Sequence, residues 1–206
     1  MLYLYPDILT LHQLKKLTSF RKFIPYFDIP LQHIAAPILQ KMGRFYDEPA
    51  IFQLLNFIKT NFPIHFIRTN VIIGFPGETD DDFRNLYSFI SQDYFDNIAL
   101  FEYHDEPLAA SFQLPDKIPE KLIRSRFRSL RSLVNQLLLA RAQARTQSTS
   151  QQTQRGYVQD IGKTTLTIRP RLHCPDIDEI DEIAFEQVLA SDDEPLQVGS
   201  KVEYRL

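Results

Sequence analysis

Three segments place polar residues or glycines directly after an apolar run, where a parallel β-strand would end. The first carries Gln32 and His33, the second is the turn from Gly74 to Glu78, and the third starts at Tyr103. Ligands of α/β proteins generally bind at the carboxyl ends of parallel strands. These three segments are therefore the candidate site for chemistry.

The turn after Gly74 combines tight geometry with little side-chain bulk. Pro76-Gly77 favours a type II turn because glycine accepts a positive φ, and Thr79 followed by Asp82 resembles a capping box that starts a helix. A purely structural strand-turn-helix is the simpler interpretation. The alternative, a ligand lying directly against the glycine backbone, stays open.

The other two segments are less specific. His33 suits a structural histidine as well as a catalytic one, since nothing nearby in sequence orients it as a base. Acidic residues follow Tyr103, which favours a solvated loop. The sequence contains no glycine-rich phosphate loop, no histidine cluster with metal-ligand spacing and no Ser/His/Asp set.

Alternating strands and helices must position these segments. Apolar runs rich in aromatic and β-branched residues indicate strands, with helical patterns between them. This repetition predicts parallel βα units, and Val71-Ile72-Ile73 lacks the polar alternation of a half-exposed strand. The expected strands are Leu2–Tyr5, Tyr26–Ile29, Phe66–Phe75 and Asn97–Tyr103, and the expected helices are Leu9–Phe20, Pro37–Met42, Pro49–Asn61 and Asp80–Gln92.

A long amphipathic helix is expected after Pro119, where apolar residues keep helical spacing and no acidic residue occurs between positions 121 and 145. A helix that covers the core with a solvated basic face is the simpler interpretation, and a nucleic-acid-binding helix is the alternative. The basic face carries Lys121, Arg124, Arg128, Arg131 and Arg141.

The composition changes again beyond this helix. The polar run Thr146–Gln154 suits a linker or a frayed helix end, and short apolar runs after it predict a small β-barrel or sandwich. Positions 155–206 carry 6 Lys/Arg against 11 Asp/Glu, a net of −5. We therefore expect two domains, residues 1–150 and 151–206. The expected strands of the second are Tyr157-Val158, Thr165–Ile168, Ile183–Phe185 and Val202–Tyr204.

The bulk composition fits a folded protein. The chain has 206 residues, 44% of them apolar, and a formal charge of −3. Its single cysteine, Cys174, excludes a disulfide framework and a self-contained cysteine-ligated cluster. No signal peptide and no apolar run long enough for a membrane span is recognisable, so we expect a soluble cytoplasmic protein.

Taken in order, four segments resemble the radical S-adenosylmethionine (radical SAM) methylthiotransferases. They are Leu2–Pro6, Tyr26–Ile34 with Met42-Gly43-Arg44, Arg68–Phe83 and Phe95–Ser111. The ordered set is far more specific than any one segment. The resemblance implies an α/β fold, namely the C-terminal part of a partial (β/α) radical SAM barrel with about four strands, followed by a small all-β TRAM-like barrel.

The same resemblance implies that S-adenosylmethionine binds at the carboxyl ends of the strands. The turn from Gly74 to Glu78 matches the strand-end motif that lies along the adenosine part of this cofactor. It assigns no catalytic residue and no metal ligand in this chain. The positions that match cofactor-facing positions of the family are Gln32, His33, Arg68, Gly74, Phe75, Pro76, Gly77, Glu78 and Tyr103.

One departure from the family is decisive. Full-length members bind [4Fe–4S] clusters through a C-x-x-x-C-x-x-C loop and three further cysteines, and this chain has neither. Without thiolate ligands no cluster forms to reduce S-adenosylmethionine. We therefore expect a split gene, a truncation or a fragment, inactive without the missing N-terminal half. The edge of the unfinished sheet at Leu2–Tyr5 should then make the isolated chain poorly soluble.

Two types of this family compete for the substrate. The stretch Ile168–Asp178 and the pair Asp105-Glu106 resemble the type that modifies an aspartate of a small-subunit ribosomal protein, rather than the type that modifies a tRNA adenosine. An acidic tail would attract a basic ribosomal protein and repel tRNA phosphates. A non-catalytic substrate-binding module is the alternative from another class, and no membrane partner is expected.

Overall fold

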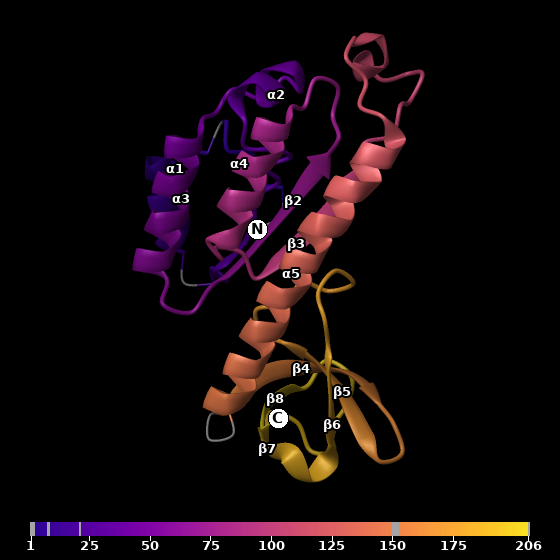
Figure 1. Ribbon diagram of the computed structural model, residues 1–206. Helices are drawn as coiled ribbons and strands as arrows, with labels where there is room; N and C mark the ends of the chain where they lie inside the picture. Colours follow the sequence, from indigo (N-terminus) through magenta and orange to yellow (C-terminus); the bar gives the residue numbers. More distant parts are fainter. Residues whose placement is uncertain (1–2, 8, 21, 150–152, 206) are drawn as a thin grey trace. The chain divides into compact units, whose positions relative to one another are not determined.

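The computed structural model describes residues 3–7, 9–20, 22–149 and 153–205. The chain divides into two compact units, Met1–Leu138 and Leu139–Leu206. Unit 1 contains a parallel sheet with helices, and unit 2 contains an antiparallel sheet (Figure 1). The boundary between the units falls within one long helix, α5 (Glu120–Thr149).

The sheet of unit 1 has the strand order β1-β2-β3, with both pairs parallel. In its register Asp28 is opposite Arg68 and Ile73 is opposite Glu102. Parallel neighbours need a crossover between them, and helices supply it here. The strands are β1 (Tyr26–Asp28), β2 (Phe66–Ile73) and β3 (Asn97–Glu102), and the helices before α5 are α1 (Leu11–Thr18), α2 (Ala36–Lys41), α3 (Glu48–Asn61) and α4 (Asp80–Ser91).

The helix that follows the glycine turn begins as its sequence predicts. The Thr79 hydroxyl accepts a hydrogen bond from the Asp82 backbone N–H, and the Asp82 carboxylate accepts one from the Thr79 N–H, so a capping box is present. The acidic residues of the first turn also suit the positive end of the helix dipole. The position of the turn is thus fixed from its helical side.

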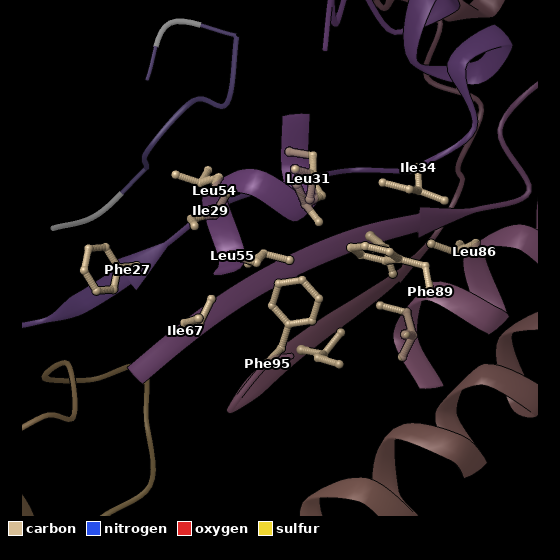
Figure 2. Packing of buried hydrophobic residues seen from close by; sticks show 14 of the residues in the cluster. Phe27, Ile29, Leu31, Ile34, Leu54, Leu55, Ile67, Leu86, Phe89 and Phe95 are labelled. Atoms are coloured by element: carbon tan, nitrogen blue, oxygen red, sulfur yellow. The ribbon is translucent and has the colours of Figure 1, made fainter. Parts of the chain in front are cut away.

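The core of unit 1 lies between β2 and the helices α3 and α4. Alternate residues of β2, such as Ile67 and Val71, are fully buried against this layer. Leu55 of α3 and Phe89 of α4 pack into the same cluster (Figure 2). The intervening β2 residues, Arg68, Asn70 and Ile72, point to the other face and are only half-buried.

The expected strand Leu2–Tyr5 was wrong in the part that the structure describes. Tyr3, Leu4 and Tyr5 form no strand, although the Leu4 N–H donates to the Asp28 carbonyl oxygen over 2.7 Å. Tyr3 has a φ of 55°, which an extended strand does not accommodate. Leu2 lies outside the described residues. The described sheet therefore has three strands where the resemblance implied about four, with β1 and β3 at its edges.

Unit 2 is an open antiparallel sheet with the order β6-β5-β4-β8-β7. Its buried residues include Val158, Leu166, Val202 and Tyr204. In the described residues the end strands β6 and β7 do not pair with each other, so unit 2 is not a closed barrel, and its expected likeness to a TRAM domain stays a prediction. The strands are β4 (Gln154–Ile161), β5 (Thr165–Pro170), β6 (Asp181–Ala184), β7 (Val188–Ser191) and β8 (Lys201–Tyr204).

The polar run Thr146–Gln154, expected to be a linker or a frayed helix end, begins as the last turn of α5. Helix α5 continues through Thr149, and Gln154 is the first residue of β4. Extending a helix that already exists costs little compared with starting one, so a polar run need not end it. Positions 150–152 lie outside the described residues. Within the described part of the chain, no helix combines the length and the apolar character that crossing a membrane requires.

Candidate functional site at the strand ends

The structure brings the three candidate segments together at the carboxyl end of β2. The Gln32 N–H donates to the Asn70 carbonyl oxygen (2.9 Å), and the Gln32 carbonyl oxygen accepts from the Ile72 N–H (2.7 Å). On the other side, the Tyr103 N–H donates to the Ile73 carbonyl oxygen (2.8 Å). Gln32 and Tyr103 therefore flank the strand end that leads into the glycine turn.

The carboxylate of Glu78 is the centre of a buried polar cluster at this turn. Its Oε2 atom accepts a hydrogen bond from the Gly74 N–H (2.8 Å), so the side chain closes the turn onto its own first residue. Its Oε1 atom accepts from Nη1 of Arg126 (2.6 Å). The Glu78 side chain has no exposed surface. A buried carboxylate needs such partners, because desolvation disfavours the charge.

His33 faces the same carboxylate. Its Nδ1 atom accepts a hydrogen bond from the Ala35 N–H (2.9 Å), and its Nε2 atom lies 3.5 Å from Oε2 of Glu78. A backbone N–H only donates, so Nδ1 carries no proton and the ring proton of the neutral imidazole is on Nε2. His33 therefore presents an N–H group to Glu78.

Arg126 is the member of this cluster that the sequence analysis missed. It is buried and joins three acceptors: Oε1 and the backbone oxygen of Glu78 through Nη1, and Oδ1 of Asp80 (2.5 Å) through Nη2. Its guanidinium hydrogen bond is the largest cause of the lowered pKa of Asp80. A signal existed, because Arg126 follows Ile123 by three positions and precedes Leu130 by four. That spacing places it on the apolar face of α5.

The two glycines of the turn leave less room than their lack of side chains suggests. Gly74 and Gly77 have φ values of 83° and 85°, as the predicted turn requires. A β-carbon on Gly74 would lie 2.4 Å from Cγ1 of Ile123, and one on Gly77 would lie 2.0 Å from Nζ of Lys41. Gly74 therefore serves close packing against Ile123, whereas the space at Gly77 is taken only by the flexible end of Lys41.

The aromatic residues of the site form a small cluster beside the turn. The rings of Phe75 and Tyr103 meet edge to face with centroids 5.3 Å apart, and Phe75 packs with Ala35 and Ile38. Pro76 is also buried. The Tyr103 hydroxyl points outward and donates to Asp105 (2.8 Å). Phe75 and Pro76 thus support the turn, and Tyr103 joins it to the solvated loop that follows.

Arg68 belongs to a polar strip on the half-buried face of the sheet. Its Nη1 atom donates to Oδ1 of the buried Asp28 (3.0 Å), in the opposite position on β1. Among the described residues, Nε of Arg68 and Oδ1 of Asn70 are buried without a hydrogen-bond partner. Buried polar atoms are nearly always paired in native proteins, so these two atoms have unused hydrogen-bonding capacity on one face of the sheet.

The polar strip offers one hydrogen-bond donor, the guanidinium N–H of Arg68, and one acceptor, the amide oxygen of Asn70. Within the described residues no group of three His, Cys, Asp or Glu side chains is placed to hold a metal. Cys174, the one cysteine of the sequence, belongs to unit 2.

Comparison with solved structures defines the class of fold. Coproporphyrinogen III oxidase (HemN) from Escherichia coli, a radical SAM enzyme, matches 66% of this chain with a TM-score of 0.56 and 20% sequence identity, over 31% of its own length. The matched part of the chain therefore has a radical SAM fold. Comparison with family models finds none that matches.

Sequence comparison identifies the family within this class. The ribosomal protein uS12 methylthiotransferase RimO of Syntrophotalea carbinolica is 31% identical over all 206 residues. The RimO proteins of Pseudothermotoga lettingae and Geobacter sulfurreducens are 38% and 33% identical over 68% and 86% of the chain. The chain belongs to this family of radical SAM methylthiotransferases. It spans 33–45% of the length of these three relatives.

Proposed function

We propose that the chain is the S-adenosylmethionine-binding and substrate-recognising part of a methylthiotransferase that modifies an aspartate of ribosomal protein uS12. The main support for this proposal is the 31% sequence identity to a uS12 methylthiotransferase over all 206 residues. S-adenosylmethionine, when bound, supplies the radical and the methyl group of this chemistry. The residues of this chain bind and orient it. The polar strip of Arg68 and Asn70 accounts for its polar groups, and the turn from Gly74 to Glu78 borders its adenosine part.

The chain alone is inactive in this proposal, because one cysteine cannot ligate a [4Fe–4S] cluster. Anaerobic reconstitution of the purified chain with iron and sulfide tests this point. We expect no visible cluster absorbance and no methylthiolation of uS12. Cluster absorbance in the isolated chain would contradict the proposed division of labour. Co-expression with a polypeptide that carries C-x-x-x-C-x-x-C should restore activity.

The acidic surface of unit 2 is the proposed docking site for the basic substrate protein. Glu179, Glu186 and Glu194 are all exposed in this unit. Their charges attract a basic protein and repel a phosphate backbone. We expect the chain to bind uS12 more tightly than tRNA at physiological salt, and the triple Glu→Gln variant at these positions to weaken uS12 binding.

The exposed arginines of α5 favour a second candidate, the tRNA-modifying type. Arg124, Arg128 and Arg131 are exposed on one side of this helix, with no acidic residue among them. Their triple Gln variant is the matched control for the glutamate variant, because each removes three like charges. Tighter binding of tRNA than of uS12, lost in the arginine variant and kept in the glutamate variant, would reject the ribosomal-protein substrate. A non-catalytic module would bind uS12 yet restore no activity on co-expression.

A further inference from the structure

Arg126 has an environment that a solvated helix face does not explain. Its side chain is 5% exposed and pairs with Oε1 of Glu78, whose own side chain is fully buried. The guanidinium also lies over the ring of Phe83, 5.5 Å from its centroid. Removing an arginine from water is costly unless several well-placed acceptors compensate. Such a burial indicates a specific task for the side chain.

The hydrogen bonds of Arg126 and Glu78 form a closed connection across the turn. Arg126 Nη1 donates to both the carboxylate and the backbone oxygen of Glu78, the last residue of the turn. The other carboxylate oxygen accepts from the N–H of Gly74, the first residue of the turn. Both ends of the turn are thus connected, through the Glu78 carboxylate, to the side chain of Arg126 on α5. His33 lies on the same side, with its Nε2 atom 3.5 Å from Oε2 of Glu78.

We propose that Arg126 is a positioning residue, which acts through Glu78 to hold the backbone of the turn in the conformation that binds the adenosine part of S-adenosylmethionine. The inference rests on the proposed function, in which this turn borders the cofactor. It adds that the affinity for S-adenosylmethionine depends on a buried residue of α5, which follows Glu78 by 48 positions in the sequence. Asp80 is the exposed partner of Arg126 and binds Nη2, whereas both contacts to Glu78 come from Nη1, so we expect Asp80 to contribute little to the positioning.

Arg126→Met tests the proposal, with Arg128→Met as its control on the exposed side of the same helix. The first readout is the backbone amide of Gly74. Its hydrogen-exchange rate and its proton chemical shift are measured in the wild-type and variant chains. Losing Arg126 should release Glu78, so this amide should exchange faster and shift upfield. Asp80→Asn and Arg128→Met should leave it unchanged.

The second readout is the affinity of the same chains for S-adenosylhomocysteine, measured by titration calorimetry. The midpoint of thermal unfolding is measured for each chain as well. We expect Arg126→Met to weaken binding by about tenfold and Arg128→Met to leave it unchanged. Glu78→Gln should weaken binding similarly, and adding Arg126→Met to Glu78→Gln should cause little further loss, because both act through one carboxylate. A general loss of stability would produce no such non-additivity.

The outcomes separate the inference from the proposed function. If the wild-type chain binds and Arg126→Met binds equally well, or if the two losses add in full, the positioning role is wrong and the proposed function stands. If the wild-type chain binds no S-adenosylhomocysteine, the proposed function fails and the inference fails with it. Should Arg126→Met not fold, Arg126→Lys replaces it. Lysine keeps the charge but cannot bridge the acceptors, so the same loss of affinity is expected.

Discussion

Gly74 faces the side chain of Ile123 so closely that a β-carbon would lie 2.4 Å from Cγ1 and 2.8 Å from Cδ1 of the isoleucine. The first residue of the strand-end turn and the first turn of α5 are therefore in direct contact. Because Gly74 also has a φ of 83°, two separate physical effects restrict this position. They can be measured separately.

Gly74→Ala should destabilise unit 1 more than Gly43→Ala. Both glycines have a positive φ, which costs an alanine about 1–2 kcal/mol, but a β-carbon on Gly43 would meet nothing within 4 Å. Overpacking against Ile123 should add about 1–3 kcal/mol at Gly74 only. Urea unfolding gives both values. Equal effects at the two glycines would show that the contact with Ile123 is unimportant.

Truncating Ile123 should relieve part of that cost. The double variant Gly74→Ala with Ile123→Ala should be less destabilised than the sum of the single variants, because the space that the new β-carbon needs is then free. A double-mutant cycle from urea unfolding measures this coupling. Full additivity would contradict the contact.

The ion pair between Asp80 and Arg126 should stabilise the protein at neutral pH but not in acid. Arg126 lowers the pKa of Asp80, so the folded state binds this proton less readily than the unfolded chain does. The stabilisation is therefore present above about pH 4 and is lost as the pH falls through the lowered pKa. Asp80→Asn should destabilise the protein near pH 6, and the difference from wild type should shrink as the pH falls through the lowered pKa. In the Arg126→Met background the substitution should have little effect over the same pH range.

Tyr204 should make unit 2 sensitive to alkali. Burial and the hydrogen bond that its hydroxyl donates to Asp181 (2.5 Å) raise the pKa of Tyr204 above its usual value. Folding therefore favours the protonated form, and its contribution is complete below about pH 10 and lost as the pH rises further. Tyr204→Phe should cost about 1 kcal/mol at neutral pH and reduce the alkaline loss, as followed by circular dichroism. An unchanged alkaline transition would refute this role.

The core between β2 and α3 should respond strongly to truncation. Leu55 is fully buried there, so Leu55→Ala should cost about 2–5 kcal/mol in urea unfolding. Ile64 is 74% exposed, and Ile64→Ala should change stability by less than about 0.5 kcal/mol. Comparable losses at both positions would mean that the packing in Figure 2 is incorrect.

The sequence predicted the elements whose patterns were strong. The apolar run Val71-Ile72-Ile73 of β2 and the periodic faces of α3 and α4 specify their own structure, and the capping box of Thr79 fixes where α4 begins. The expectation at Leu2–Tyr5 failed because a short apolar run says nothing about φ, and Tyr3 is left-handed. The sequence analysis also overlooked β7 (Val188–Ser191).

The sequence predicted where the candidate site lies but not the hydrogen bonds between its side chains. Glycine, proline and histidine after apolar runs located the strand ends, which the fold then brought together. The burial of Arg126 was missed because a charged residue on an amphipathic helix is ordinarily counted with the solvated face. Its acceptors on Glu78 lie 48 positions away in sequence, so only the folded chain shows them.

The hydrogen bond from the Ala35 N–H to Nδ1 limits what His33 can contribute to chemistry. The only nitrogen of this imidazole with a free lone pair is occupied by the main chain, and the other nitrogen carries its proton toward a carboxylate inside the protein. A ring held in this way has no site from which to abstract a proton from a substrate. Since His33 is also fully buried, electrophiles that label accessible histidines should leave it unmodified while the chain is folded.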